Sequence, residues 1–272
     1  MRSKKAPDMK KYLVIGNPIA HSQSPRLHNY WIKKNNISAV YEKKKLDARE
    51  LKNLILLVKR RSISGINVTV PFKKDIIPFL DELSLEADKT QSVNTICLKN
   101  NKVTGYNTDI DGFKLSIKET KFNVKNKKIL ILGAGGVVPS IIFALNKMEA
   151  SQIVVSNRTK NKAENLKKLF KDLTVVDWGN IPIFDMIINA TSVGLNKNDK
   201  IDLDLSKIEK RKFFYDVIYN PKETNFLKIG KKLGGKIKNG EMMFIYQAMA
   251  AFKIWHGIKP KINSDLIKVL NR

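Results

Sequence analysis

One stretch of the chain constrains the fold more than any other: an apolar run, a glycine turn and an apolar helical segment in immediate succession. Residues 128–132 (KILIL) are followed at once by GAGG at 133–136, and residues 141–148 then have the composition of a buried helix. A strand that is apolar on both faces is typical of a parallel sheet with helices on each side. The order of strand, turn and helix therefore predicts an α/β architecture.

The same alternation covers most of the chain. Short apolar or β-branched stretches alternate with longer stretches of helical spacing, which is the pattern of βαβ units. The strands expected from it are 12–16, 39–41, 65–70, 128–132, 153–156, 174–176, 186–189 and 213–219. Residues 93–99 and 102–107 instead predict an antiparallel hairpin that turns at Asn100 and Asn101.

Polar and glycine-rich segments predict where the domains divide. A helix expected from Ile110 to Glu119 precedes a polar stretch, and glycines at 234, 235 and 240 precede an apolar helix expected from Glu241 to Trp255. Because that last helix is too apolar to stand alone, we expect it to pack back on the first domain. The expected division is a flexible tail at 1–10, a first domain at 11–109 plus 239–272, and a second domain at 110–238.

Composition excludes several classes of protein. Hydrophobic residues make up 43% of 272, enough for a sizeable core. Apolar runs stay well short of the roughly 18 residues that span a bilayer, and the basic start has no apolar segment of a secretion signal, so a cytoplasmic protein is expected. Cys97 is the single cysteine, and His21, His28 and His256 have no metal-ligand spacing, so neither a disulfide nor a metal is expected.

The charge balance is unusual, with 51 Lys and Arg against 25 Asp and Glu and a net charge of +26. Such an excess can serve a nucleic acid, an anionic membrane surface or small anionic ligands. The lysines are spread along the whole chain, whereas nucleic-acid binders usually concentrate them in a stripe or an arm. We therefore expect a lysine-rich surface and a small-molecule substrate, without a nucleic-acid or membrane partner.

The glycine turn predicts a phosphate site, and the next strand suggests which one. Glycines let backbone N–H groups approach a pyrophosphate at a helix N-terminus, although a tight connection without a ligand has the same sequence. A fold selective for NAD places an acidic residue at the end of the second strand. This chain has Asn157, Arg158 and Thr159 there. Unless Arg158 is one more surface cation, its forked contact with a 2′-phosphate favours NADP over NAD.

Two serines follow the first strand, at an edge where open α/β sheets bind ligands. Ser22 and Ser24 lie on one turn, immediately before Pro25. Ser24 followed by Pro25 has the sequence of an N-cap and a first helical residue, which would explain Ser24 without any ligand. The pair could also grip a carboxylate, and that interpretation alone accounts for Ser22.

A lysine and an aspartate have the chemistry for proton transfer. Lys73 lies just beyond the strand that carries Asn67 and Thr69, and a lysine beside a carboxylate in a cleft can pass a proton, although most lysines are solvated. Asp109 is the candidate carboxylate, and its alternative role is to cap the helix that follows. Asn94 adds an amide.

Nine short segments are together similar to one enzyme family. In order they are GNPIAHSQSP (16–25), NVTVPFK (67–73), VNT (93–95), GYNTD (105–109), GAGG (133–136), NRT (157–159) with KA (162–163), NATSVG (189–194), DVIYNPKET (216–224) and EMMFIYQA (241–248). From about residue 12 onward, the chain resembles the shikimate dehydrogenases. The resemblance implies a reversible reduction of 3-dehydroshikimate to shikimate with NADPH, on the route to chorismate and aromatic amino acids.

The family resemblance also implies an architecture and a site. Two domains would flank a cleft: an N-terminal α/β substrate domain with a mainly parallel sheet, and a Rossmann-like NADP-binding domain. Lys73 and Asp109 would form the acid/base pair. Substrate contacts would come from Ser22, Ser24, Thr69, Lys73, Asn94, Asp109, Tyr219 and Gln247. Cofactor contacts would come from Gly133, Ala134, Gly135, Gly136, Val137, Asn157, Arg158, Thr159, Lys162, Thr191, Ile218 and Gly240.

The sequence departs from the family's pattern in two respects, and two alternative functions stay open. Val137, Val138 and Pro139 replace the small or basic residues often found after this glycine turn, which bears on the strength of pyrophosphate binding. The high charge is the other departure. A quinate/shikimate dehydrogenase, often using NAD, is the nearest alternative, and a non-catalytic basic NADP-binding regulator is the second. The sequence is compatible with a monomer or a homodimer.

Overall fold

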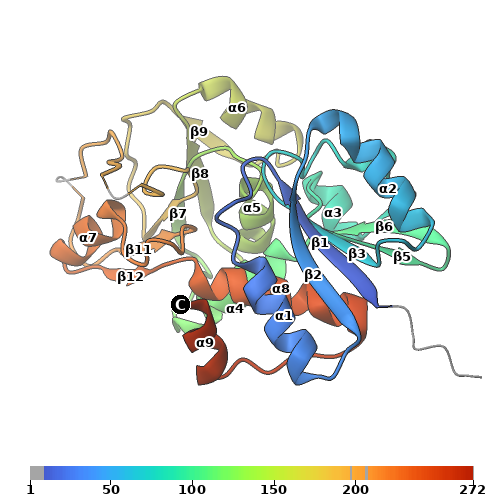
Figure 1. The fold of residues 1–272 in the computed structure, drawn as a ribbon. Coiled ribbons are helices and arrows are strands. Elements are labelled where there is room, and N and C mark those ends of the chain that lie inside the picture. Colours follow the sequence, from blue (N-terminus) through green and yellow to red (C-terminus); the bar gives the residue numbers. More distant parts are fainter. Residues whose placement is uncertain (1–8, 197, 206–207, 272) are drawn as a thin grey trace, which may run out of the picture. The chain divides into compact units, whose positions relative to one another are not determined.

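The computed structural model describes residues 9–196, 198–205 and 208–271, in two compact units (Figure 1). The first unit comprises Met1–Thr108 and Ala248–Arg272, and the second comprises Asp109–Gln247. The second boundary therefore falls inside the last long helix, nine residues after the position that the glycines suggested. Of the expected tail, residues 1–8 lie outside the described residues, and Lys10 already belongs to a strand.

The sheet of the first unit is mixed. Its strands are β1 (Lys10–Gly16), β2 (Ala39–Lys45), β3 (Gly65–Val68), β4 (Glu82–Leu83), β5 (Thr95–Lys99) and β6 (Lys102–Tyr106), in the order β2-β1-β3-β5-β6-β4. The β2-β1-β3 and β6-β4 pairs are parallel, whereas β3-β5 and β5-β6 are antiparallel. The predicted hairpin is confirmed: Asn100 and Asn101 have φ of 48° and 60°, as a two-residue turn between twisted strands requires.

Helices cover both faces of that sheet. They are α1 (Ser24–Lys34), α2 (Leu51–Lys59), α3 (Leu85–Thr90), the C-terminal half of α8 (Glu241–His256) and α9 (Ser264–Leu270), with single 3₁₀ turns at Ala48–Glu50 and Ile77–Phe79. Leu13 of β1 joins an aliphatic core with α2, whereas Tyr12 packs against Trp255 of α8 on the opposite face. A Cβ at Gly65 would lie 2.5 Å from the indole nitrogen of Trp255, so the helix packs there only because Gly65 has no side chain.

The sheet of the second unit is parallel throughout its six described strands. These are β7 (Lys128–Leu132), β8 (Gln152–Ser156), β9 (Thr174–Val176), β10 (Met186–Asn189), β11 (Phe213–Asp216) and β12 (Lys236–Lys238), in the order β12-β11-β10-β7-β8-β9. The direction in which strands are added reverses between β7 and β10. In open α/β sheets, ligands bind beside the carboxyl ends of the strands at such a switch point.

Alternate residues of these strands belong to different cores. The helices of the unit are α4 (Asp109–Glu119), α5 (Val138–Lys147), α6 (Lys160–Glu164) and α7 (Asn225–Lys232), with a 3₁₀ turn at Asn165–Lys168. Ile129 and Ile131 of β7 pack with α4 and α5, whereas Leu130 and Leu132 pack with α7 on the other face. Burial on both faces explains why β7 is a continuous apolar run.

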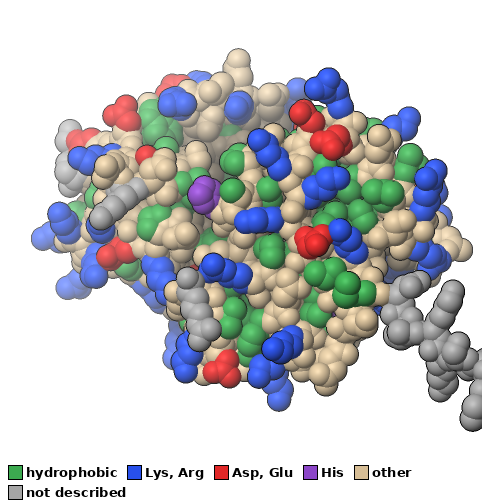
Figure 2. All heavy atoms as spheres, viewed as in Figure 1, with side chains coloured by type: hydrophobic (Ala, Val, Ile, Leu, Met, Phe, Trp, Pro, Cys, Tyr) green, Lys and Arg blue, Asp and Glu red, His purple; other side chains and the backbone are tan. Residues whose placement is uncertain are grey.

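The charged side chains are dispersed. In Figure 2, Lys and Arg side chains lie scattered over the whole visible face, with Asp and Glu side chains between them. Among the described residues, no helix is long and apolar enough to cross a membrane. Within the same residues, no group of three or more His, Cys, Asp or Glu could hold a metal ion.

Candidate functional site

The glycine turn connects β7 to α5 and has the shape of an anion cradle. Gly133 has a φ of 111°, which favours glycine, and its N–H donates to the Ser156 carbonyl at 2.8 Å. A Cβ there would lie 2.9 Å from the Ala190 carbonyl. At Gly135, no described atom lies within 4 Å of the position that a Cβ would take. The turn thus combines a tight backbone with open space on its outer side, where a pyrophosphate could approach the backbone.

The residues that depart from the family pattern do not fill this space. Val138 and Pro139 are buried at the start of α5, where Val138 belongs to the core beneath the sheet. Proline is compatible with the first helical turn because its missing N–H would have no partner within the helix. Val137, at the N-cap, has no polar side-chain atom to compete with a ligand for the helix N-terminus. The substitutions therefore leave the anion cradle accessible.

The segment after β8 presents a cation beside this turn, because β7 and β8 are neighbouring strands. Arg158 is exposed, and the Asn157 amide closes the local turn by donating to the Thr159 carbonyl at 2.8 Å. Thr159 is the N-cap position of α6, and Lys162 is exposed in its first turn. A guanidinium at this place can bind a phosphate in a forked contact.

Three neighbouring strands, β10, β11 and β12, bring further predicted cofactor residues to the same edge. Thr191 follows β10, and its methyl group would lie 3.1 Å from a Cβ on Gly133. Ile218 follows β11 and accepts a hydrogen bond from the Gly240 N–H at 3.0 Å. A Cβ on Gly240 would overlap the Val217 carbonyl, so the approach of these segments depends on a glycine. The glycine turn, Thr191, Ile218 and Gly240 therefore form one continuous edge of the second unit.

Beneath these loops lies a polar pair that the sequence did not identify as functional. Asp216, the last residue of β11, and Asn189, the last residue of β10, are both 0% exposed. The Asn189 amide donates to Asp216 Oδ1 at 3.1 Å. Burial raises the pKa of Asp216 to about 6, although hydrogen bonds from Thr224, Ile218 and Asn189 act in the opposite direction. The signal that could have revealed the pair was a polar residue closing each of two apolar strands.

In the first unit, the two serines lie where β1 passes into α1. The helix begins at Ser24 and its N-cap position is Gln23, so the alternative of Ser24 as the N-cap is wrong. Ser22 is half-buried and its hydroxyl accepts from the Ser24 N–H at 3.3 Å. Ser24 is buried, and its side chain hydrogen-bonds the Tyr41 hydroxyl. Both hydroxyls therefore have defined positions at the carboxyl end of β1.

A network of amides and hydroxyls continues from this point across the sheet. The Tyr41 hydroxyl donates to Asn67 Oδ1 at 2.7 Å, and the Asn67 amide donates to Thr95 Oγ1 at 3.0 Å. Asn94 donates to Thr108 Oγ1 at 3.0 Å, and its own oxygen accepts from the Thr108 N–H at 2.8 Å. These side chains are buried and neutral, so they can present hydrogen bonds to a polyhydroxylated ligand without a charged partner.

Lys73 lies at the same edge in a turn tied to both neighbouring segments. Its backbone carbonyl accepts from the Val93 N–H at 2.9 Å, next to Asn94. Thr69, which just follows β3 and is half-buried, donates its N–H to the Ile15 carbonyl at 2.9 Å. Lys73 is only 8% exposed, whereas the adjacent Lys74 is exposed. The structure therefore brings Thr69, Lys73 and Asn94 to the edge that also carries the two serines.

The remaining predicted substrate residues belong to the second unit. Asp109 is the first residue of α4 and is 6% exposed. A Cβ on Gly112, one turn later, would lie 2.9 Å from Cβ of Gln247, so α4 and α8 are in close contact there. Tyr219 stacks on Phe244 of α8, with ring centroids 4.6 Å apart. Asp109 and Gln247 thus occupy one corner of this unit, and Lys73 belongs to the other unit.

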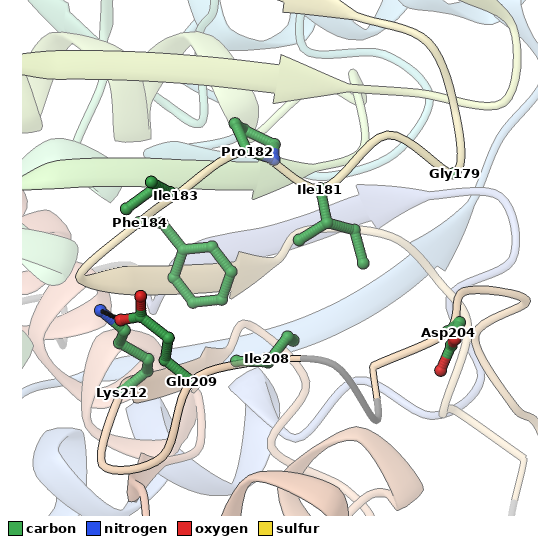
Figure 3. A pocket seen from close by; sticks show the side chains of 9 residues that line it. All are labelled: Gly179, Ile181, Pro182, Ile183, Phe184, Asp204, Ile208, Glu209 and Lys212. Atoms are coloured by element: carbon green, nitrogen blue, oxygen red, sulfur yellow. Dashed lines mark ion pairs between the residues drawn. The ribbon is translucent and has the colours of Figure 1, made fainter.

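A hollow of about 360 Å³ lies elsewhere in the second unit and is drawn in Figure 3. Its lining comes from the segment before β10, which includes Phe184, and the segment before β11, which includes a 2.6 Å ion pair between Lys212 and Glu209. The lining includes none of the residues predicted to bind substrate or cofactor. The hollow is therefore separate from the candidate site.

Comparison with protein families identifies both halves of the chain. Residues 14–96 match a family described as the shikimate dehydrogenase substrate binding domain, and residues 116–223 match a family described as shikimate / quinate 5-dehydrogenase. A curated relative from Pelagibacter ubique (strain HTCC1062), named shikimate dehydrogenase (NADP(+)), is 61% identical over 262 residues. That match covers 96% of this chain and 99% of the relative.

Solved structures agree with these families. The crystal structure of shikimate dehydrogenase from Aquifex aeolicus has a TM-score of 0.89 and 39% identity, covering 98% of this chain and 99% of that chain. A shikimate 5-dehydrogenase from Thermus thermophilus, solved in complex with NADP(H) and shikimate, has a TM-score of 0.88 and 30% identity. Its match covers 97% of this chain and 99% of that chain.

Proposed function

The chain belongs to the shikimate dehydrogenase family, and we propose that Lys73 and Asp109 carry its reaction, the reversible reduction of 3-dehydroshikimate to shikimate with NADPH. The observation that carries this proposal is the position of Lys73. It is a buried lysine at a sheet edge lined by hydroxyl and amide groups, which suit a hydroxylated acid better than an apolar ligand. Its neighbour Lys74 is exposed, as an ordinary surface lysine would be.

The polar edge of the first unit supplies groups for each part of the substrate. The hydroxyls of Ser22 and Ser24 donate to the carboxylate, and Thr69 and Asn94 bind ring hydroxyls. Because Asn94 is held by Thr108 on two sides, its amide is preorganised before the ligand arrives. Asp109, Gln247 and Tyr219 complete the substrate contacts from the second unit.

Proton transfer is assigned to the ammonium group of Lys73. During reduction, a hydride adds to the ketone carbon and Lys73 Nζ gives its proton to the oxygen, which becomes the hydroxyl of shikimate. In the reverse direction the amine of Lys73 takes that proton back. Asp109 accepts hydrogen bonds from the lysine and the substrate, and so holds both in place.

The residues of the second unit fit an NADP(H) molecule. The open outer side of the turn at Gly135 and the start of α5 suit the pyrophosphate, and exposed Arg158, with Asn157, Thr159 and Lys162, suits the 2′-phosphate. Thr191, Ile218 and Gly240 line the nicotinamide end. NADPH, when bound, supplies the hydride.

Quinate is the alternative substrate to be tested, because one of the two matching families carries both substrates in its description. Quinate differs from shikimate in having a saturated ring with an additional hydroxyl. The groups named for the first unit do not distinguish the two acids by charge. The cytoplasmic location and the monomeric or homodimeric state stay predictions.

The test is steady-state turnover of the purified chain. NADPH oxidation with 3-dehydroshikimate is measured beside NADH, and NADP⁺ reduction is measured with shikimate and with quinate. We expect rapid turnover with NADPH and the shikimate pair, and at least about tenfold lower kcat/KM with NADH. Equal turnover of quinate would identify the broader dehydrogenase. NADPH binding without turnover of either acid would contradict the proposal.

A further inference from the structure

We propose that Asp216 is a positioning residue for the cofactor site: its carboxylate, together with Asn189, holds the loops after β10 and β11 in the arrangement that receives the nicotinamide end of NADPH. The proposal rests on the function assigned above. It concerns two residues that lie beneath the cofactor-binding edge, and neither was among the residues predicted to contact a ligand.

The Asp216 carboxylate joins three separate segments. It accepts from the Thr224 hydroxyl at 2.6 Å, from the Ile218 N–H at 3.0 Å and from the Asn189 amide at 3.1 Å. Thr224 is the N-cap of α7, where its hydroxyl also accepts from the Leu227 N–H at 3.3 Å. One carboxylate therefore fixes both ends of the 217–224 loop and links that loop to β10.

Asn189 organises the neighbouring loop in the same way. Its side-chain oxygen accepts from both the N–H and the hydroxyl of Thr191, at 3.1 and 2.7 Å, and its amide also donates to the Val193 carbonyl at 3.1 Å. The turn at 190–193 is thus folded around a single side chain. Since that side chain is bonded to Asp216, the two loops share one anchor.

Both anchored loops reach the cofactor-binding edge. Thr191 lies beside Gly133 of the glycine turn, and the Ile218 carbonyl holds Gly240. Gly194 also approaches the Thr224 side chain, and a Cβ there would lie 3.1 Å from its methyl group. A shift of the Asp216 carboxylate would therefore displace the groups assigned to the nicotinamide end.

The energetics of Asp216 favour a positioning role over a purely structural one. Burial raises its pKa to about 6, so the ionised group lowers stability at neutral pH relative to a neutral side chain. A neutral amide of the same size would avoid the cost of burying the charge but would lose one of the three hydrogen bonds. The ionised form offers four acceptor positions and no donor, which matches three converging donors. An amide in its place would direct a donor at one of them.

Asp216→Asn tests the proposal, with dissociation constants for NADPH measured by ligand fluorescence and melting temperatures measured in parallel. We expect NADPH to bind roughly tenfold more weakly, with the melting temperature at pH 7 lowered no more than in Ser116→Ala, which also loses one buried hydrogen bond. In turnover assays KM for NADPH should rise, while KM for shikimate at saturating cofactor stays within about twofold. Unchanged NADPH affinity would overturn the proposal.

A second pair of variants keeps the test valid if Asp216→Asn does not fold. Thr224→Val removes the 2.6 Å hydrogen bond, whereas Thr224→Ser retains the hydroxyl. Affinity for NADPH should fall in the valine variant and be close to normal in the serine variant. Equal loss in both, in proportion to lowered stability, would contradict positioning. Ser116→Ala, which breaks the buried 2.7 Å contact with Tyr215 elsewhere in the unit, is the control and should leave NADPH affinity unchanged.

These measurements separate the proposal from the function on which it rests. If the wild-type chain binds NADPH but turns over neither acid, the assigned reaction fails, and the effect of Asp216→Asn on NADPH affinity still decides the positioning role. If the wild-type chain does not bind NADPH, both proposals are wrong.

Discussion

The two units both carry buried polar clusters at the carboxyl edges of their sheets, but the clusters differ in charge and in depth. In the first unit the cluster is neutral, and Asn94 and Ser24 are themselves proposed to contact substrate. In the second unit the centre is a carboxylate, Asp216, and it lies beneath loops that would make the contacts. In the proposed function the first cluster is thus a binding surface, whereas the second supports the loops that bind.

The difference follows from the ligands that each unit is proposed to hold. A small hydroxylated acid can be recognised by side chains directly, because its groups are few and fixed in relation to one another. A dinucleotide is long, and a large part of its recognition comes from backbone N–H groups and loop ends. Loops need an anchor, and a carboxylate that accepts several hydrogen bonds supplies one. Variants in the first unit should therefore impair turnover or substrate binding, whereas variants in the second unit should impair NADPH binding.

The largest effect is expected at Lys73. Lys73→Ala should lower kcat by about 10²- to 10⁴-fold, because the alkoxide loses its proton donor. Affinity for NADPH, which the second unit is proposed to bind, should not change. Steady-state kinetics and NADPH titration check both statements. Lys74→Ala, which removes the adjacent exposed lysine, is the matched control, and near-normal turnover of Lys73→Ala with intact folding would remove Lys73 from the acid/base role.

At Arg158 we expect an effect on cofactor preference and not on substrate binding. Arg158→Asp removes a forked partner for the 2′-phosphate and adds repulsion, so the preference for NADPH over NADH should fall by roughly 100-fold. Shikimate affinity should stay as in the wild type. Lys171→Asp makes the same change of charge at another exposed site of the unit. If Arg158→Asp and Lys171→Asp each lower the affinities for NADPH and NADH by equal factors, the assignment of the 2′-phosphate to Arg158 is wrong.

Acid should lower the unfolding free energy of the first unit, because the pKa values of two of its histidines are lowered by burial. Burial lowers the pKa of His28 to about 3 and that of His256 to about 4, below the ordinary value of 6.5. Their contribution to stability is therefore complete above pH 6.5 and is lost as the pH falls through 6 toward 4. Asp216 has the opposite sign, since its pKa is raised and its contribution is lost as the pH rises through about 6.

His28→Phe tests this statement because it keeps the ring that stacks on Tyr41, whose centroid is 4.2 Å away. Among the described residues neither ring nitrogen of His28 has a hydrogen-bond partner, so the replacement leaves no orphaned group. The loss of unfolding free energy between pH 7 and 5 should shrink by on the order of 2 kcal/mol. An unchanged slope in His28→Phe would contradict the assignment of this acid sensitivity to His28.

The smallest effect concerns a polar pair of the second unit outside the cofactor-binding edge. Ser116→Ala leaves the buried Tyr215 hydroxyl without its 2.7 Å partner and should cost about 1 to 2 kcal/mol of unfolding free energy. Turnover and NADPH affinity should stay within about twofold. Denaturant unfolding measures the change in unfolding free energy. A change in NADPH affinity would show that the loss of any buried polar contact in this unit weakens cofactor binding, so that the effect is not specific to Asp216.

The sequence predicted those elements that a short stretch of neighbouring residues determines by itself. Continuous apolar runs predicted β7 and β10 to the residue, and Asn100 with Asn101 predicted the hairpin turn. It did not predict β4 or β12, which are two and three residues long and depend on pairing with distant strands. The strand expected at 213–219 ends at Asp216, because the chain there turns toward the carboxylate instead of continuing the ladder.

The candidate site residues stay predictions, and the sequence proposed those near strand ends. Arg158 lies two residues after β8 and Lys73 five residues after β3. The burial of Lys73 against the exposure of Lys74 depends on the turn at 69–76, which no local pattern reveals. The role of Asp216 was hidden for another reason. Its three partners are 2, 8 and 27 residues away, and only the folded sheet brings them together.

Crossed binding measurements test most directly whether the first unit binds shikimate and the second unit binds NADPH. Calorimetry would give dissociation constants of shikimate and of NADPH, each titrated alone, for the wild type, Ser24→Ala and Arg158→Asp. We expect Ser24→Ala to weaken binding of shikimate alone and Arg158→Asp to weaken binding of NADPH alone, each by about tenfold or more. A variant in one unit that weakens both ligands equally would contradict it.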